Sequence, residues 1–229
     1  ANIGSGPDMV MSWFDDPFQY PDKLLDVTEL ANKLADLNGG WYDGPRGYAV
    51  HEDRFIAMPL CAIGNAICYR QSHMEKAGFT EFPTDTAGFL ELCKALKANG
   101  TPAGFPHGKA VGDGNNYAHW LLWSHGGKMN NEDATVAIDS PETRAAIEYA
   151  KELYATFIPG TESWLDINNN RAFLAGQVSL TANGVSLYYA AMNDPALQEI
   201  GADIRTTNMP IGPIGSSVEL HQTTSISIF

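Results

Sequence analysis

The chain has 229 residues, a hydrophobic content of 44% and a net charge of −13 at pH 7. This length allows one large domain or two modest ones, each with a buried core. The acidic excess opposes binding to nucleic acid or anionic membrane surfaces, because their phosphate groups would be repelled. No stretch approaches the ~20 consecutive apolar residues that a membrane-spanning helix needs. We therefore expect a globular protein that does not bind nucleic acid.

The cysteines are Cys61, Cys68 and Cys93, an odd number without a CxxC pair. This pattern indicates neither a disulfide framework nor a structural zinc site. We expect three buried thiols that pack as small apolar groups.

The first elements are a strand and a helix. Pro7–Trp13 is nearly all apolar, which is typical of a parallel strand covered on both faces. Thr28 is expected to cap a helix that ends before Gly39. The buried face of this helix should carry Leu30, Leu34 and Leu37.

A hairpin and a long strand should follow. Two apolar runs flank the polar turn His51–Asp53, which predicts a hairpin. Ala62–Tyr69 reads as one longer strand. The start of the chain is a glycine-rich loop before an apolar run, and its last residues alternate like a strand, so we expect the natural polypeptide to be longer.

Helical patterns dominate the remainder, and strands alternating with helices predict an α/β fold with mostly parallel sheets. In such sheets, ligands bind beyond the carboxyl ends of the strands. The expected elements are helices at Ser72–Ala77, Thr84–Asn99 (buried Phe89, Cys93 and Leu96), Tyr117–Ser124, Ser140–Phe157 (capped by Ser140) and Asn169–Ala175, a strand at Val178–Thr181 and a turn at Asn183–Gly184.

Two acids follow the first strand, beside Trp13. Asp15 and Asp16 could serve a glycosidase or could accept hydrogen bonds from a bound sugar. Neighbouring side chains in an extended segment point to opposite sides, so these two acids cannot flank one scissile bond. A catalytic pair would need a second acid from elsewhere. The pattern favours sugar binding over cleavage.

The other polar groups near predicted loop ends are mainly amides and aromatic rings. Asn116 and Tyr117 stand at a helix start, and Asp113 with Asn115 lacks the further ligands of a calcium loop. No serine, cysteine or histidine lies in a recognised catalytic or metal-binding motif. Rings that stack on sugar faces and amides that bond hydroxyls are typical of carbohydrate sites. We expect neither a cofactor nor a metal.

Several segments, in order, resemble bacterial extracellular solute-binding proteins, family 1, the sugar receptors of ABC importers. They are GPDMVMSW, LLDVTEL, NAICYRQSHMEKAGF, WLLWSHGG, IDSPETRAAIEYAKELY and NRAFLAGQVSLTANGVSLYY. The resemblance implies a two-lobe periplasmic-binding-protein fold with a ligand cleft between the lobes and no catalysis. It divides the chain into part of lobe 1 (1–64), lobe 2 (65–217) and a return crossing (218–229).

The same resemblance implies a monomer, periplasmic or tethered outside the membrane, that closes on a carbohydrate or polyol and delivers it to an ABC permease. Ser186 replaces the tryptophan of the maltose-type turn, which favours a smaller or more polar ligand. The implied ligand-binding residues are Trp13, Asp15, Asp16, Asn65, Asn116, Tyr117, Trp164, Asn183, Gly184, Ser186, Tyr188, His221 and Gln222.

Two alternatives stay open. One is a carbohydrate-active enzyme that uses Asp15 or Asp16 with an undetected partner. The other is a receptor for a peptide or a sulfonated sugar, in which a basic side chain binds an anion. The candidates for that role are Arg46, Arg70, Arg171 and His221.

Overall fold

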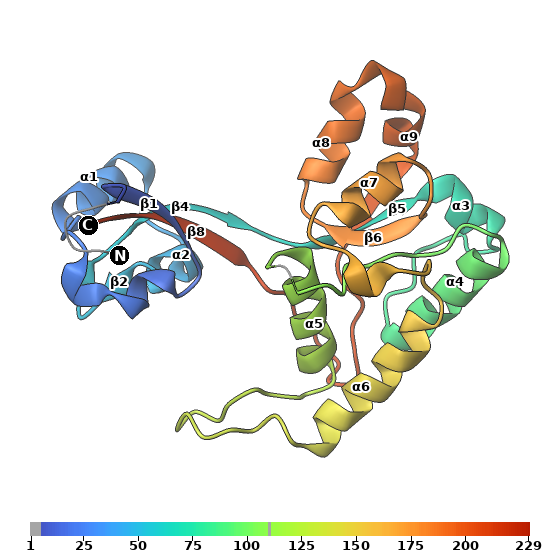
Figure 1. Ribbon diagram of the computed structural model, residues 1–229, viewed down its shortest axis with the longest axis horizontal. Helices are drawn as coiled ribbons and strands as arrows, with labels where there is room; N and C mark the ends of the chain where they lie inside the picture. Colours follow the sequence, from blue (N-terminus) through green and yellow to red (C-terminus); the bar gives the residue numbers. More distant parts are fainter. Residues whose placement is uncertain (1–5, 110) are drawn as a thin grey trace. The chain divides into compact units, whose positions relative to one another are not determined.

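The computed structural model describes residues 6–109 and 111–229 and separates into two compact units. The first unit contains the described residues up to Gly64 together with His221–Phe229, and the second is Asn65–Leu220. Figure 1 traces the chain through both units. The first unit therefore uses both ends of the chain, whereas the second is one continuous segment.

The first unit contains a three-stranded sheet in the order β1-β8-β4. Its strands are β1 (Met9–Trp13), β8 (Gln222–Ile228) and β4 (Met58–Ile63), and both pairings are antiparallel. The predicted parallel strand, buried on both faces, is wrong. Met9 and Met11 are 56% and 59% exposed, because strand alternation turns them away from the covered face.

Helix α1 (Thr28–Asn38) packs against this unit through a different face from the predicted one. Leu30 and Leu37 are 50% and 71% exposed, so the expected leucine stripe is wrong. The fully buried residue is Ala31, whose small side chain lets the helix approach Phe55 closely. Gly39 ends the helix in a left-handed conformation, as predicted.

The predicted hairpin is confirmed. Strands β2 (Val50–His51) and β3 (Arg54–Phe55) pair antiparallel. The connecting residues Glu52 and Asp53 both have positive φ, which two-residue hairpin loops of the favoured twist require.

The second unit has a three-stranded sheet in the order β6-β5-β7, formed by β6 (Leu180–Asn183), β5 (Ala66–Arg70) and β7 (Ile204–Thr207). The expected single strand Ala62–Tyr69 is wrong, because the chain breaks at Gly64 and Asn65 and continues into this other sheet. Both strand pairs are again antiparallel. The mostly parallel sheets predicted from the sequence are therefore also wrong for the named strands.

Among the described residues, parallel pairing occurs only as isolated bridges. Ala103 forms isolated parallel bridges with Leu180 and with Phe157. Gly104 N–H donates to the Leu180 carbonyl oxygen at 2.9 Å. A segment thus runs parallel beside β6, but it is too short to form a strand.

Two helix caps differ from the prediction by one residue. Val27, rather than Thr28, precedes α1, and Asp85, rather than Thr84, caps α4. The Asp85 carboxylate accepts the Gly88 N–H at 2.8 Å. The predicted cap of α6 is confirmed, since Ser140 accepts a backbone N–H one turn later.

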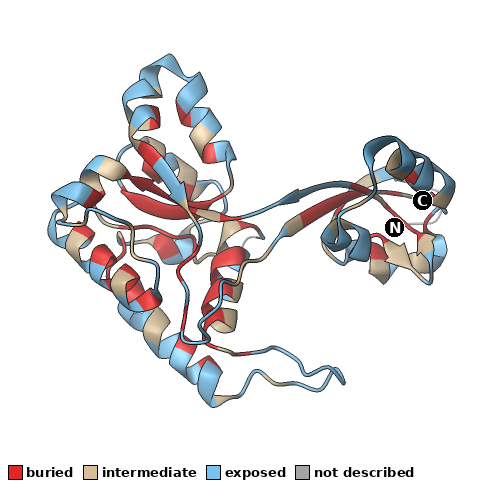
Figure 2. Cartoon of the chain, turned by 180° about the vertical axis from the view of Figure 1, so that it is seen from behind, coloured by how far each residue is buried: buried red, intermediate tan, exposed pale blue. Residues whose placement is uncertain are grey.

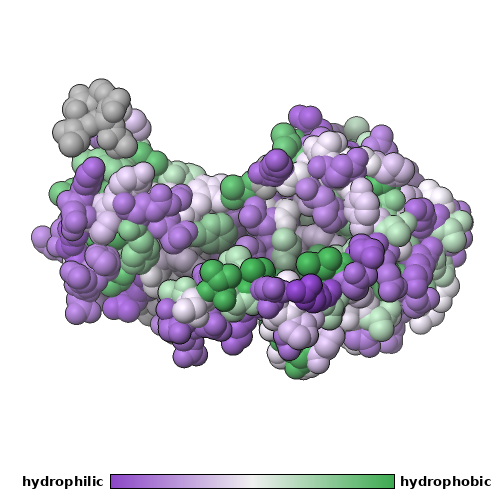
Figure 3. All heavy atoms as spheres, turned by 60° about the horizontal axis from the view of Figure 1, so that its bottom comes forward, coloured by the Kyte–Doolittle hydropathy of each residue, from purple (hydrophilic) through white to green (hydrophobic). Residues whose placement is uncertain are grey.

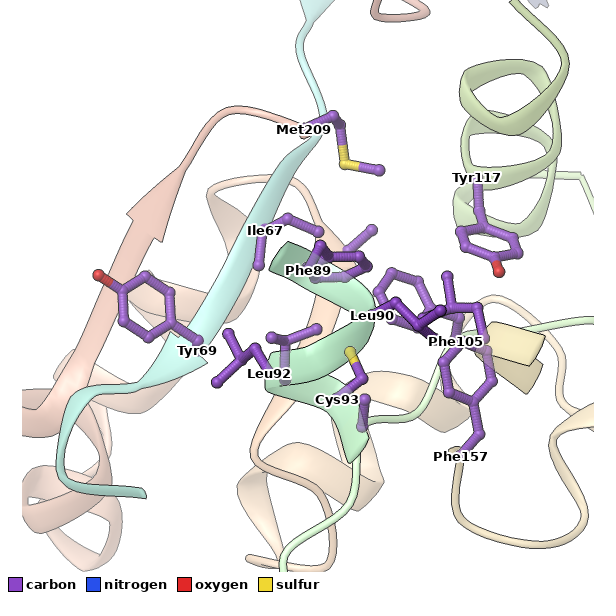
Figure 4. Close-up of a cluster of buried hydrophobic side chains, with 14 of the residues drawn as sticks. Ile67, Tyr69, Phe89, Leu90, Leu92, Cys93, Phe105, Tyr117, Phe157 and Met209 are labelled. Carbon is purple, nitrogen blue, oxygen red and sulfur yellow. The ribbon is translucent and has the colours of Figure 1, made fainter. Parts of the chain in front are cut away.

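The helices of the second unit carry buried residues (Figure 2) and pack on two apolar clusters, of which Figure 4 shows the one rich in aromatic rings. Phe89, Cys93 and Leu96 are buried in it, as predicted. The helices are α3 (Gln71–Lys76), α4 (Thr86–Ala98), α5 (Asp113–Ser124), α6 (Pro141–Tyr154), α7 (Asn168–Leu174), α8 (Ser186–Asn193) and α9 (Gln198–Asp203). The second unit also contains the short 3-10 turns Thr161–Ser163 and Pro195–Leu197, and the first unit contains α2 (Asp43–Gly47) and the 3-10 turns Asp16–Gln19 and Pro21–Lys23.

The surface is largely hydrophilic with scattered apolar patches on the face that Figure 3 shows. Of the cysteines, Cys68 and Cys93 are buried as predicted, but Cys61 is exposed at the edge strand β4, so that part of the prediction is wrong. No helix in the described parts of the chain is both long and apolar enough to cross a membrane.

Candidate functional site

The ends of four elements of the second unit meet in one polar cluster. Asn183 ends β6, Asp113 opens α5, and Asn169 and Asn170 lie in the first turn of α7. Ser186 opens α8. We refer to Asp113, Asn169, Asn170, Asn183 and Ser186 as the asparagine cluster.

Glycine and local side-chain bonds bring these helix ends together. Gly112 has a φ of 127°, and a Cβ at this position would collide with the Asp166 carboxylate. That close approach lets Asp166 Oδ1 accept the backbone N–H of Asp113 at 2.7 Å. Asn168 Oδ1 accepts the Leu165 N–H at 2.8 Å and so fixes the start of α7.

Hydrogen bonds link the cluster into a single network. Asp113 Oδ2 accepts Nδ2 of Asn169 at 2.8 Å and Nδ2 of Asn183 at 2.9 Å. The same Asn183 Nδ2 also donates to Asn170 Oδ1. On its other side, Asn183 Oδ1 lies 3.4 Å from the Ser186 hydroxyl, which donates to it. One carboxylate therefore holds two amides, and one of these amides reaches two further residues.

The electrostatics of the cluster centre on Asp113. Burial raises the pKa of its carboxyl to about 7, the hydrogen bond from Asn169 opposes this rise, and the nearby Asp166 charge adds to it. At neutral pH, Asp113 therefore populates both its neutral and its ionised form.

The cluster has a buried layer and an accessible layer. Asn169 and Asn183 are almost fully buried, whereas Asn170 is half-buried and Ser186 is exposed. Asn169 Oδ1 is buried without a hydrogen-bond partner among the described residues. Amides and a hydroxyl can bind a polar solute, and the cluster holds neither a nucleophilic thiol nor an imidazole.

The predicted site residues of the first unit lie at or near the ends of its strands. Trp13 ends β1 and is half-buried, and Asp15 and Asp16 are exposed. Asp16 Oδ2 accepts the Trp13 N–H at 2.9 Å, so this acid shapes the turn that carries the ring. Of the other two, Gln222 begins β8 and His221 is exposed just before it.

Two predicted residues on α5 lie deeper than the sequence suggested. Asn116 is buried, and the Tyr117 ring is 1% exposed in the aromatic core that Figure 4 shows. Its centroid lies 4.7 Å from that of the Phe105 ring and 5.8 Å from that of the Trp120 ring. The Tyr117 hydroxyl is buried without a partner in the described chain. From the sequence we expected this ring at the start of a helix, and the family resemblance implied that it contacts the ligand.

The remaining predicted residues of the second unit are separate from the cluster or beside it. Asn65 is buried, and its Oδ1 accepts the next backbone N–H. Trp164 packs over Gly104, where a Cβ would come within 2.9 Å of the ring. Tyr188 lines a groove of about 520 Å³. The other residues of this groove come from α8, α9 and β7 and include Tyr189, Met192 and Arg205.

Asn183 and Ser186 of the asparagine cluster are predicted site residues, and the predicted Gly184 lies next to Asn183 in the chain. The other members of the cluster, Asp113, Asn169 and Asn170, were not predicted as site residues. Asp113 was considered only as a calcium ligand, and Asn169 and Asn170 only as helix residues. The signals that could have found them are the run NNN at 168–170 and the GDG at 112–114. No group of His, Cys, Asp and Glu that could hold a metal occurs within residues 6–109 and 111–229.

A model of the family described as "Bacterial extracellular solute-binding protein" matches residues 1–222. The chain belongs to this family. One relative of this solute-binding protein is the "Putative ABC transporter periplasmic-binding protein YcjN" of Escherichia coli (strain K12). The two are 22% identical over 194 residues, which are 81% of this chain and 44% of the relative.

Solved structures show the same fold. The maltose-bound MalE3 of T. maritima has a TM-score of 0.85 at 23% identity, over 97% of this chain and 57% of that one. An ABC transporter solute-binding protein from Agrobacterium radiobacter K84, in complex with ribitol, has a TM-score of 0.80 at 20% identity, over 98% and 58%. The predicted two-lobe α/β class is confirmed for this solute-binding protein, which spans about half the length of these relatives.

Proposed function

We propose that this chain is part of the solute-binding component of an ABC importer. In this proposal it works outside the cytoplasm as a monomer, captures a carbohydrate or polyol, and delivers it to a membrane permease. The observation that carries the proposal is the family match over residues 1–222. The maltose and ribitol in the similar structures support the ligand class.

The chemistry of the asparagine cluster supports a polyhydroxyl ligand. Asn170 and Ser186 are accessible from solvent, and amide and hydroxyl groups form hydrogen bonds with vicinal hydroxyls. Ser186 offers no ring for stacking, so we propose a small polyol or monosaccharide rather than a long oligosaccharide. Tyr188 and Trp164 are the aromatic candidates of this unit.

The first unit offers a second set of candidate contacts. The half-buried Trp13 ring has the large apolar face that stacks on sugar C–H groups. Asp15 and Asp16 provide exposed acceptors beside it. The proposal includes Asn65, Asn116, His221 and Gln222 as further contacts that mutation can test, whereas Tyr117 belongs to the aromatic core.

We propose binding without turnover. The rival, a glycosidase using Asp15 or Asp16, needs a second acid at a fixed distance. Asp16 instead bonds the backbone of its own turn.

Calorimetric titration of the natural protein with ribitol and maltose tests the proposal, together with an assay for release of reducing sugar from maltose. We expect saturable binding of at least one ligand and no product. Ser186→Ala should weaken binding severalfold, whereas Ser216→Ala, at an exposed serine of the same unit, should not. Release of product would favour the enzyme, and no binding of either compound would contradict the proposed ligand class.

A further inference from the structure

The buried half of the asparagine cluster presents almost no surface to a ligand in this structure. Asn169 and Asn183 are almost fully buried, and the carboxylate that holds them is largely desolvated. Burying such groups costs free energy unless their hydrogen bonds compensate. If these residues served only to stabilise the fold, apolar side chains could fill the same space. The polar network therefore needs an explanation other than stability.

The network dictates which atoms the surface residues present. A carboxylate accepts hydrogen bonds only, so Asp113 Oδ2 selects the N–H end of the Asn183 amide. That same N–H group bonds the carbonyl oxygen of Asn170, which leaves the Asn170 N–H groups to donate outward. The Asn183 oxygen, in turn, accepts the Ser186 hydroxyl, which leaves the Ser186 oxygen to accept.

We propose that Asp113 is a positioning residue that fixes the orientations of the Asn183, Asn170 and Ser186 polar groups, so that the cluster offers one donor and one acceptor to a neutral vicinal diol. This inference rests on the proposed function and narrows its ligand class. A diol matches the pair because each hydroxyl can donate and accept. If the diol hydroxyl that meets Ser186 were replaced by a group that can only accept hydrogen bonds, the Ser186 oxygen would have no ligand donor to accept from.

The charges around Asp113 also select against anions. Asp166 places a second carboxylate beside it, and the buried thiol of Cys68 on β5 is also near. Burial and the Asp113 charge raise the pKa of this thiol to about 12. An anionic ligand would add a third negative charge without a cation in the cluster. We therefore expect a sugar acid to bind more weakly than the corresponding polyol.

Two substitutions separate positioning from mere helix capping. Asp113→Asn keeps one acceptor oxygen at nearly the same place, whereas Asp113→Ala removes it. We expect Asp113→Asn to bind ribitol within about threefold of wild type and Asp113→Ala to bind at least tenfold more weakly. Equal affinity in wild type and Asp113→Ala would overturn the proposal.

The pH dependence of ligand affinity separates the two roles of Asp113, because helix capping alone would not make affinity depend on pH. Ionised Asp113 makes charge-assisted bonds to both amides, so wild-type affinity should rise with pH through about 7. Asp113→Asn should show no such rise. Asp166→Asn removes the neighbouring charge that raises the pKa of Asp113, so the midpoint of the rise should shift to lower pH. A profile shared by all three proteins would overturn the proposal.

A ligand-free measurement separates this inference from the proposed function. The side-chain amide resonances of Asn169 and Asn183 should titrate near pH 7 in the NMR spectrum of the wild-type protein and stay constant in Asp113→Asn. Constant resonances in wild type would refute the positioning role. Titrating resonances in a protein that binds neither ribitol nor maltose would refute the proposed ligands while leaving the network intact.

Discussion

Arg70 Nε lies 2.6 Å from Asp203 Oδ2, and this ion pair joins the end of β5 to the end of α9. The same carboxylate accepts the backbone N–H and the hydroxyl of Ser72 at 2.8 and 2.7 Å. Arg70 is thus engaged within the protein, which weighs against the anion-binding role considered for it from the sequence.

Asp203→Asn should lower the free energy of unfolding by about 1.5–3 kcal/mol, the usual range for a hydrogen bond to a charged group. Burial alone would raise the pKa of Asp203, but the bonds from Ser72 and Arg70 outweigh it and lower the pKa below its usual value. This stabilisation is present above the unfolded-state pKa and is lost as the pH falls through the folded-state value.

Urea unfolding between pH 2 and pH 7 measures this effect. The matched control is Asp139→Asn, which breaks the exposed ion pair with Arg144 and should cost under about 0.5 kcal/mol. Equal losses in the two variants would mean that the Arg70–Asp203 pair is effectively solvated.

Tyr117→Phe distinguishes a core tyrosine from a ligand contact. The hydroxyl is buried without a partner in the described chain, so its removal should leave stability unchanged or raise it by about 1–2 kcal/mol. Ligand affinity should not change. Unfolding and calorimetry on the same samples check both outcomes, and a clear loss of affinity would show that this hydroxyl meets the ligand.

Trp13→Ala should lower the affinity for a confirmed sugar ligand by about 2–4 kcal/mol, the range of aromatic binding hot spots. Asp16→Asn should have a larger effect than Asp15→Asn, because only the Asp16 carboxylate also bonds the Trp13 backbone. Calorimetric titration of the three variants decides this order. Wild-type affinity in all of them would remove the segment from the binding site.

The three thiols should differ sharply in reactivity. Cys61 is exposed, whereas Cys68 and Cys93 are buried and burial raises the pKa of both thiols. A thiol reagent such as Ellman's should therefore label one cysteine per chain in the native state and three in denaturant. Cys61→Ser should abolish native labelling, and rapid native labelling of a second thiol would contradict this burial.

The sequence predicted elements best where local chemistry dictates structure. The Glu52–Asp53 turn and the Ser140 cap depend on neighbouring residues alone, and both were found. Predictions from the sequence failed where the burial of a side chain depends on segments that are distant in the chain. Leu30 and Leu37 have a helical spacing typical of a core face, yet the face that packs carries Ala31. The prediction of parallel strands was wrong for the same reason, since β1 pairs antiparallel with β8, which is distant in the sequence.

The candidate site shows the same division. Asn183 and Ser186 were identified through a family turn, a local motif. The carboxylate that organises them is 70 residues away in sequence, so spacing could not connect it to Asn183. Burial, which gives Asp113 its altered pKa, is likewise a tertiary property that composition cannot reveal.

The pairing of Ile63 with Gln222 means that the chain leaves the first unit and returns to it at adjacent points. A protease that cut at both points would release the second unit as one uninterrupted fragment. It would leave the described part of the first unit as two fragments, joined by the hydrogen bonds of β8 with β1 and β4 and by the bond from Leu25 N–H to the Ile228 carbonyl oxygen. During synthesis, β1 and β4 therefore cannot join in this sheet until the chain that follows the second unit has been made.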